Sequence, residues 1–470
     1  MRKAAYLIVL CIWWACKVPQ AGVMPTTQAL PQTFSNAAHS MTKELPNWRT
    51  YFNDPTLVAL IDTALRHNQE LLTVNQELNI LQNEILARKG EYLPFVNVQA
   101  YNEYARDGKY TWKEGVNENL NKQNHPEVVE SNNDLKVGLA ASWELDVWHK
   151  LRNAKKAAAT RYLAGVEGRH FFITQLVAEI AESWYQLMAL DNLLLIVQQN
   201  IDLQADALKI VKLQKESAKV TQLAVNRFEA QLLNTQNLQY DIKQRIVETE
   251  NHIHQLTGVF PRPLAHSAGA FNQLNVPAPA AGLPASLLAN RPDIKQATLQ
   301  IEAANIDVQV ARAMFYPAFR LQAGVGLQAF SPTFLLHPQS AVFNLAGDML
   351  APLINKSAIK AAFASANARQ IQTLYQYEQT IITAYIEVVN QLAKANNFKA
   401  SYTTKAQEVD MLTQSVGIAN NLFKSARADY MEVLLTQREA LQTRMELIEI
   451  KLKQAEAMVG VYRALGGGWQ

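Results

Sequence analysis

Two long stretches of this chain contain no proline. The chain has 17 prolines, yet none lies between Pro126 and Pro261 and none follows Pro352. Proline removes a backbone donor and clashes with the preceding turn, so a long tract without it can stay helical throughout. Apolar residues recur at every seventh position in both tracts, and this period predicts long helices that wrap into a left-handed supercoil. The repeating positions are Ile173, Ile180, Leu187, Leu194, Ile201 and Leu208 in the first tract, and Leu374, Ile381, Val388, Ala395, Tyr402, Val409, Val416 and Phe423 in the second.

The two halves of the chain also repeat each other. Glu70 in the first half matches Asp293 in the second, and Pro94 matches Pro317, at a constant offset of about 223 positions. A constant offset over such a distance is typical of an internal repeat. Each half is predicted to run helix, strand, loop, strand, long helix, turn, long helix. The predicted strands are 95–104, 135–145, 319–329 and 342–350.

The N-terminus is typical of an exported protein. Arg2-Lys3 and the apolar run 4–15 form a secretory signal, and this run is too short to remain as a membrane-spanning helix. Ala15-Cys16 resembles the end of a bacterial lipobox, so we expect Cys16 to become the acylated, palmitate-bearing first residue of a lipoprotein. Lys17 follows, which is the pattern of sorting to the outer membrane. The alternative is an ordinary signal peptide that contains two incidental cysteines, Cys11 and Cys16.

Composition and strand number limit the architecture. With 49% hydrophobic residues, 18% charged residues and a net charge of +3, the chain is neither disordered nor basic enough to suggest nucleic acid. No segment after the N-terminus offers 18 consecutive apolar residues, so strands would have to make any membrane crossing. Four strands cannot close a barrel, and unpaired backbone groups in lipid cost several kcal/mol each, so copies must combine. Three chains would supply twelve strands and a second cylinder made of their long helices.

The predicted domain organisation follows from these features. It consists of a signal peptide at 1–15, a first repeat at 16–256, a linker at 257–286 and a second repeat at 287–470. The first repeat holds a strand pair within 95–145 and a helical hairpin at 150–256, and the second holds a strand pair within 319–350 and a helical hairpin at 356–465. Five prolines in the linker predict a non-helical crossing between the repeats.

Short motifs distributed along the whole mature chain resemble the TolC family of outer-membrane efflux ducts, and in particular its lipoprotein branch, which serves resistance-nodulation-division pumps. The resemblance implies a mainly helical homotrimer with a shared 12-stranded membrane barrel, four strands coming from each chain. It also implies a long coiled-coil α-barrel in the periplasm and a collar that includes the linker. The motifs are Trp48-Arg49-Thr50-Tyr51-Phe52-Asn53-Asp54-Pro55, Trp143-Glu144-Leu145-Asp146-Val147-Trp148, Gly282-Leu283-Pro284, Arg291-Pro292-Asp293-Ile294 and Ala464-Leu465-Gly466-Gly467-Gly468-Trp469.

The resemblance also implies functional positions at the two turns between helices. The residues that would contact a periplasmic adaptor are Lys219, Val220, Thr221, Arg427, Ala428 and Asp429. Glu432 would present a ring of carboxylates to the pore, and Leu435 an apolar constriction next to it. The alternatives are solvated loop residues and, for Glu432, an ion pair with Arg438.

Three departures from the family pattern lie at the same turns. Ala218 and Ala426 stand where relatives usually carry glycine, which adopts the left-handed conformation of such a turn most easily. Relatives latch the closed end with a Tyr and an Asp, and the corresponding positions here are Phe423 and Ala224. We therefore expect this latch to be absent.

The predicted function is passive conduction of drugs, metals or other small solutes across the outer membrane of a Gram-negative bacterium. The expected partners are two further copies, a periplasmic adaptor, an inner-membrane pump and outer-membrane lipid. Two alternatives remain: an exit duct for type I protein secretion, and a non-channel coiled-coil lipoprotein of the envelope. No catalytic constellation, cofactor motif or metal spacing is predicted, and His252 and His254 are interpreted as structural.

Overall fold

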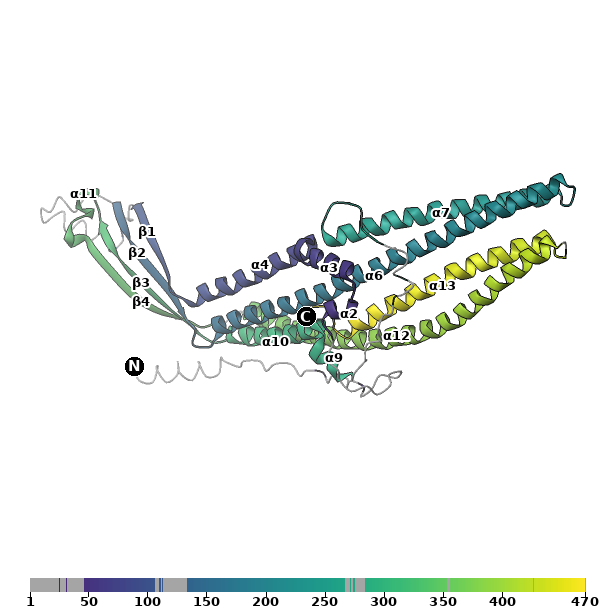
Figure 1. The fold of residues 1–470 in the computed structure, drawn as a ribbon. Coiled ribbons are helices and arrows are strands. Elements are labelled where there is room, and N and C mark those ends of the chain that lie inside the picture. Colours follow the sequence, from purple (N-terminus) through teal and green to yellow (C-terminus); the bar gives the residue numbers. More distant parts are fainter. Residues whose placement is uncertain are drawn as a thin grey trace. The chain divides into compact units, whose positions relative to one another are not determined.

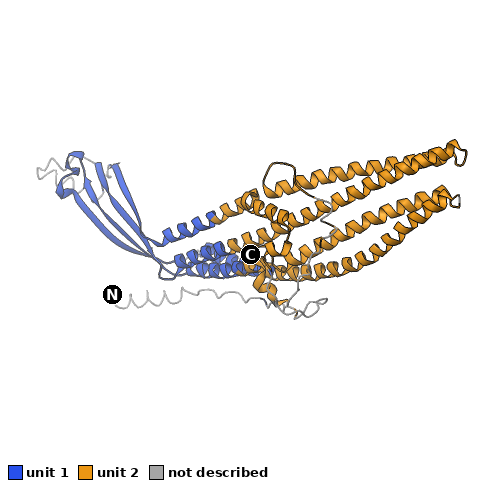
Figure 2. Cartoon of the chain, viewed as in Figure 1, with its two compact units in different colours: residues 1–26, 79–163, 299–375 blue, residues 27–78, 164–298, 376–470 orange. Residues whose placement is uncertain are grey.

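The computed structural model describes residues 46–105, 133–266, 284–352, 356–425 and 427–469, together with 25, 31, 110, 112, 271 and 274. The expected signal peptide, Cys16 and half of the expected linker lie outside these residues. The chain divides into two compact units (Figure 2): residues 1–26, 79–163 and 299–375 form unit 1, and residues 27–78, 164–298 and 376–470 form unit 2. Each unit is therefore assembled from both halves of the sequence.

Unit 1 contains one antiparallel sheet in the order β1-β2-β3-β4 (Figure 1). The strands are β1 (Phe95–Tyr104), β2 (Asn133–Leu145), β3 (Ala318–Ala329) and β4 (Ala341–Leu350). Their bounds agree with the predicted strands to within two residues. The central pairing joins β2 of the first half to β3 of the second, so the two repeats share one sheet.

The two faces of this sheet differ in chemistry. Residues directly opposite one another in antiparallel strands point to the same face. One register row crosses all four strands with exposed apolar side chains, namely Val98, Leu139, Val325 and Phe343. The adjacent row, which points to the opposite face, is small or polar and consists of Asn97, Ala140, Gly324 and Asn344. The sequence alternation thus produces an apolar face that no described part of the chain covers.

Two helical hairpins follow the two strand pairs. The first hairpin is α6 (Lys150–Glu216) with α7 (Gln222–Thr257), and the second hairpin is α12 (Ser357–Lys424) with α13 (Tyr430–Ala464). The long arms have 67 and 68 residues, which the absence of proline permits. Gly258 ends α7 in the left-handed region at φ 68°, where a Cβ would lie 2.1 Å from the carbonyl oxygen of His67.

Shorter helices complete the fold. They are α2 (Trp48–Phe52), α3 (Pro55–His67), α4 (Gln69–Tyr92), α9 (Ala285–Asn290), α10 (Pro292–Ala313), α11 (Pro332–Leu335) and the 3₁₀ turn η2 (Pro338–Ser340). Asp54 starts α3 because its carboxylate accepts the backbone N–H groups of Thr56 and Leu57, while Pro55 occupies the first helical position. None of the described helices is long and apolar enough to cross a membrane.

The core of unit 2 packs α2 and α3 against the hairpin arms. Tyr51 of α2 stacks on Tyr462 of α13 with ring centroids 4.1 Å apart, and both rings are buried. The first predicted heptad line lies in this core or in the cluster near the end of the first hairpin, since all six of its residues are buried or pack against buried residues. The second line is covered only in part: Val388 is fully buried, whereas Val409 and Val416 are half-exposed.

Candidate functional site

The turn of each hairpin closes with the same backbone hydrogen bond. In the first hairpin, the N–H of Lys219 donates to the carbonyl of Gln214 at 2.9 Å, and in the second the N–H of Arg427 donates to the carbonyl of Leu422 at 2.9 Å. This six-residue bond is the Schellman closure of a helix end. It places Ala218 in the left-handed region at φ 56°. This is the conformation expected at a position where relatives carry glycine. Ala426 lies outside the described residues.

The residues that the sequence assigned to adaptor contact lie on these turns. Lys219 and Thr221 are exposed in the first turn, and Arg427 and Asp429 are exposed in the second. Val220 and Ala428 are half-buried. Val220 also packs against the apolar cluster beneath its turn, so this side chain contributes to packing as well as to the surface.

An apolar cluster holds the ends of the two hairpins together within unit 2. Its buried residues come from the first hairpin, and Phe423, Tyr430 and Leu434 of the second hairpin pack against them. The Nη1 of Arg227 on α7 lies 2.9 Å from the Sδ of Met431 on α13. The buried members are Leu208, Val211, Ala224, Val225 and Phe228. Phe423 and Ala224, the positions of the expected missing latch, therefore belong to one hydrophobic contact region.

Glu432 and Leu435 lie on the first two turns of α13. Both are exposed, and Leu435 retains 49% of its accessible surface. No ion pair joins Glu432 to Arg438 among the described residues. The carboxylate of Glu432 instead lies near the N-terminus of α13, where the helix dipole favours negative charge. The two side chains are one helical turn apart and available to face a common axis if copies of the chain assemble around one.

The sequence did not reveal two side chains that tie the bases of the hairpins. His266 contacts Asp191 of α6 through Nδ1 and Glu250 of α7 through Nε2, the latter at 3.1 Å. Arg291 bridges the two helices of the second hairpin in the same way. It donates to Glu387 of α12 at 2.9 Å and to the carbonyl of Ala464 at the end of α13 at 2.7 Å. The Arg291-Pro292-Asp293 motif could have indicated the second tie, but no sequence signal indicated the first.

The bridging residues His266 and Arg291 differ in whether their charge changes with pH. Burial lowers the pKa of His266, but the hydrogen bonds and charges of Asp191 and Glu250 outweigh burial and raise the pKa above its ordinary value. Burial also raises the pKa of Asp191 in spite of the nearby imidazole. Arg291 stays charged throughout the accessible pH range.

The other histidines make structural contacts in the described part of the chain. The Nε2 of His254 lies 2.7 Å from the carbonyl oxygen of Arg262, and His252 lies 3.4 Å from Glu179. The described residues contain no group of three or more His, Cys, Asp or Glu side chains that could hold a metal ion.

A sheet with one uncovered apolar face, joined to long helical hairpins in a duplicated chain, defines a class of membrane-inserted export proteins. The sequence model described as "Outer membrane efflux protein" matches residues 60–259 and 283–467. The chain belongs to this family, and it is an efflux channel protein of the outer membrane.

Individual relatives agree with this assignment. The pyoverdine export outer membrane protein OpmQ of Pseudomonas aeruginosa is 27% identical over 440 residues, which cover 92% of this chain and 90% of OpmQ. The solvent efflux pump outer membrane protein SrpC of Pseudomonas putida is 26% identical, over 96% of this chain and 93% of SrpC. A crystal structure of CusC superposes with a TM-score of 0.82 at 23% identity, covering 95% of this chain and all of that one. A similarity at this identity establishes the TolC-like fold.

Proposed function

We propose that this chain is one of three identical subunits of an exit duct, which receives small solutes from an inner-membrane pump through a periplasmic adaptor. The observation that carries the proposal is the sheet. A row of exposed apolar side chains from Val98 to Phe343 crosses all four strands, and its reverse face is small and polar. That pattern fits lipid on one side and an aqueous lumen on the other.

The strand edges support assembly of several copies. β1 and β4 each pair with a strand on one side only among the described residues. Unpaired backbone groups are not tolerated in hydrocarbon, so each edge requires a neighbouring sheet. Three copies close a barrel of twelve strands. The half-exposed heptad positions of α12, including Val409 and Val416, provide an apolar stripe for the neighbouring helices of the same trimer.

The hairpin ends supply the proposed entrance. Lys219, Thr221, Arg427 and Asp429 are exposed where an adaptor would dock, with Val220 and Ala428 beside them. Three copies of Glu432 around the axis form an acidic ring, and three copies of Leu435 form an apolar ring. These roles depend on the trimer, because in one chain both side chains face solvent.

The type of cargo is inferred from the relatives. OpmQ is named for pyoverdine export and SrpC for solvent efflux. Both names refer to small molecules, which favours small solutes over the type I secretion of proteins. The paired strands argue against a non-channel coiled-coil lipoprotein. Acylation of Cys16 stays part of the proposal as an added membrane anchor.

Mass and conductance measurements on the purified chain test the proposal. Native mass spectrometry after gentle detergent extraction should give a trimer, and the trimer should conduct ions in planar bilayers. Val98→Pro removes a ladder donor and kinks β1, so it should lower trimer yield strongly, whereas Val98→Ile should not. A monodisperse wild-type monomer without conductance would refute the duct. Cys16→Ser should abolish palmitate labelling and leave trimers in the membrane.

A further inference from the structure

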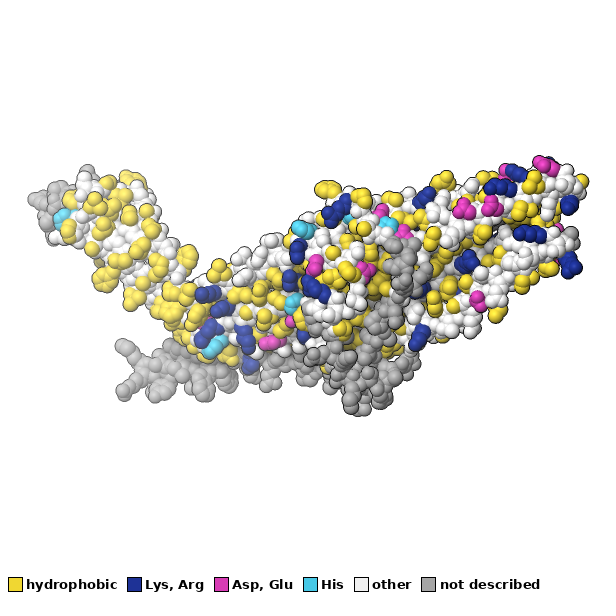
Figure 3. Space-filling view, viewed as in Figure 1, with side chains coloured by type: hydrophobic (Ala, Val, Ile, Leu, Met, Phe, Trp, Pro, Cys, Tyr) yellow, Lys and Arg dark blue, Asp and Glu magenta, His cyan; other side chains and the backbone are white. Residues whose placement is uncertain are grey.

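The helices that adjoin the sheet in unit 1 carry an excess of positive charge. Residues 79–92, 146–163, 299–313 and 356–375 contain eleven Lys or Arg and five Asp or Glu. The described residues of unit 2 contain 23 Lys or Arg and 26 Asp or Glu. Figure 3 shows Lys and Arg side chains gathered over the helices next to the sheet, whereas both signs are mixed along the hairpins. The net charge of +3 therefore arises largely from one short helical region.

The acidic residues of this region are mostly engaged already. Asp146 accepts the backbone N–H groups of Leu151 and Arg152 and pairs with the Arg152 guanidinium at 3.2 Å. Glu84 and Glu91 both pair with Arg88, and Asp307 pairs with Arg161.

Several lysines remain without such partners. Lys89, Lys156 and Lys360 are exposed, and none of them forms an ion pair with a described residue. They lie on α4, α6 and α12, three helices that connect directly to strands of the sheet. The charge of these helices is predominantly positive, so an anionic surface against them would be favourable.

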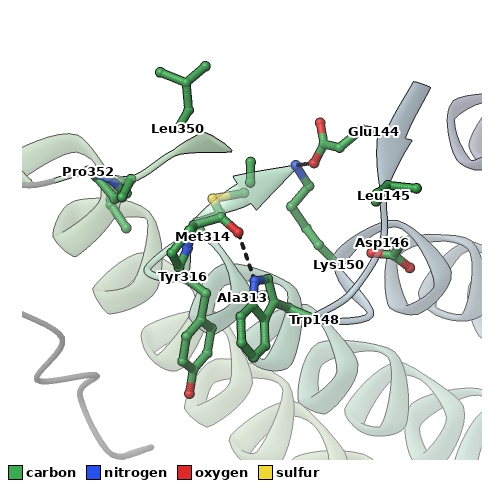
Figure 4. Close-up of a pocket in the computed structure, with 14 residues that line it drawn as sticks. Glu144, Leu145, Asp146, Trp148, Lys150, Ala313, Met314, Tyr316, Leu350 and Pro352 are labelled. Atoms are coloured by element: carbon green, nitrogen blue, oxygen red, sulfur yellow. Dashed lines mark hydrogen bonds and ion pairs between the residues drawn. The ribbon is translucent and has the colours of Figure 1, made fainter. Parts of the chain in front are cut away.

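A cavity of about 320 Å³ lies where the strands meet these helices (Figure 4). One wall is aromatic: Trp148 stacks on Tyr316 with centroids 4.6 Å apart, and the indole N–H of Trp148 donates to the carbonyl of Pro317 at 2.8 Å. Lys150 points into the cavity and pairs with Glu144. Leu350 and other apolar residues complete the lining. Such a combination of aromatic, apolar and cationic groups is typical of the boundary between hydrocarbon and water.

The position of the cavity and the lysines relative to the membrane follows from the direction of the strands. All four connections between strand and helix occur at one end of the sheet, because β1 and β3 begin there and β2 and β4 end there. The apolar row across the sheet marks the hydrocarbon layer under the proposed function, on which this step rests. Phospholipid headgroups of the periplasmic leaflet then lie at the level of the cavity and the lysines.

We propose that the cavity and the exposed lysines of the adjoining helices form a binding surface for anionic phospholipid headgroups. We call this set the lipid collar: Trp148, Tyr316, Lys150, Lys89, Lys156 and Lys360. The lysines attract the phosphate and its net negative charge, and the aromatic pair packs against the glycerol region. An acidic protein would complement the positive charge, but charge complementarity would not account for the apolar and aromatic lining of the cavity.

Lipid binding to the full chain in dodecyl maltoside tests this surface. Native mass spectrometry would count phosphatidylglycerol and phosphatidylcholine retained by the protein at equal added concentrations. The triple variant Lys89→Gln, Lys156→Gln, Lys360→Gln should lose affinity for phosphatidylglycerol on the order of tenfold, with phosphatidylcholine affinity unchanged. The loss should shrink as salt rises, because screening weakens exposed charges.

A matched variant separates local from global charge. Lys243→Gln, Lys424→Gln, Lys453→Gln removes the same charge from exposed lysines of unit 2 and should retain wild-type binding. Tyr316→Leu should weaken both lipids alike, because the aromatic wall does not sense headgroup charge. Equal losses in the two triple variants, or no preference of the wild type for phosphatidylglycerol, would overturn the proposal. Selective binding by a protein that conducts no ions would support the lipid collar while refuting the duct.

Discussion

The two helical hairpins share a backbone plan but use equivalent positions differently. Their turns close with the same bond, and residues 208 positions apart correspond, as Lys219 does to Arg427. At one such pair, Ala224 is fully buried against the second hairpin, whereas Glu432 is exposed. At the next pair both residues are exposed, and the guanidinium of Arg227 contacts the sulfur of Met431 in the second hairpin. The first hairpin thus uses this face for packing within the chain, and the second leaves it available to an assembled pore.

The ends away from the turns repeat the contrast. A side chain from outside each hairpin bridges its two arms, but His266 serves the first and Arg291 the second. A duplicated sequence therefore gives two similar scaffolds whose stability responds differently to mutation and pH. The predictions below exploit this contrast, and the largest expected effect comes first.

Truncation of a buried aromatic residue in the first hairpin should cost more stability than truncation of its counterpart in the second. Phe228→Ala removes a side chain that is 2% exposed from the cluster between the hairpin ends, and should destabilise that region by about 3–5 kcal/mol. The equivalent Thr436→Ala in the second hairpin should cost less than about 0.5 kcal/mol. Hydrogen exchange of the backbone amides in the two turns measures the loss of stability in each variant. Equal losses would mean that the hairpins contribute equally to the cluster.

Rising pH should loosen the base of the first hairpin selectively. Because the folded-state pKa of His266 is raised above 6.5, its stabilisation is fully present below that value and is lost as pH rises through the folded pKa. The raised pKa of Asp191 acts in the same direction. Hydrogen exchange at residues 259–266 should accelerate between mildly acidic and alkaline pH beyond the intrinsic chemical rate, while residues 286–292, held by Arg291, should not.

That pH effect requires the imidazole. In His266→Gln the acceleration beyond the intrinsic rate should disappear, since an amide does not titrate. Persistence of the effect in this variant would assign it to other groups.

Wetting the proposed apolar ring should open the channel. Leu435→Ser should raise single-channel conductance several-fold with little change in ion selectivity, because it replaces an apolar constriction by a polar one. The equivalent Arg227→Ser in the first hairpin should leave conductance near the wild-type value. If Arg227→Ser has the larger effect, the constriction lies on the first hairpin and its assignment to Leu435 is wrong.

Removal of the acidic ring should alter selectivity more than conductance. Glu432→Gln should reduce the preference for cations and the block by multivalent cations in planar bilayers, without loss of trimer. Glu439→Gln, an exposed residue further along the same helix, is the control. Unchanged reversal potentials in Glu432→Gln would make this glutamate an ordinary surface residue.

The smallest effect concerns the strained turn. Ala218→Gly should stabilise the first turn by about 0.5–1 kcal/mol, because glycine adopts φ 56° without steric conflict. Ala230→Gly, on the exposed surface of α7, should instead cost about 1 kcal/mol. Thermal unfolding of the two variants should shift in opposite directions, and a shift in the same direction would argue that the turn is not strained.

The site was only partly readable from the sequence. The positions of both turns and the roles of Glu432 and Leu435 came from family resemblance, and the two roles stay predictions. The packing of Phe423 in one cluster with Ala224 could not be read, because about 200 residues separate them and no local pattern specifies which faces of two hairpins meet. His266 gave no signal, since its partners lie 75 and 16 positions away.

The sequence by itself determined the elements of this protein. Proline-free heptad tracts required long helices, alternating polarity placed the strands to within two residues, and the constant offset required two similar halves. These are local properties, set by backbone geometry and side-chain period. Only the tertiary structure decided that β2 pairs with β3 across the repeats, and that Lys150 joins Trp148 and Tyr316 in one cavity. It also decided that the first heptad line lies in or against buried clusters, while Val409 and Val416 of the second line stay half-exposed. Such choices depend on contacts between distant segments, which packing selects and residue order alone does not.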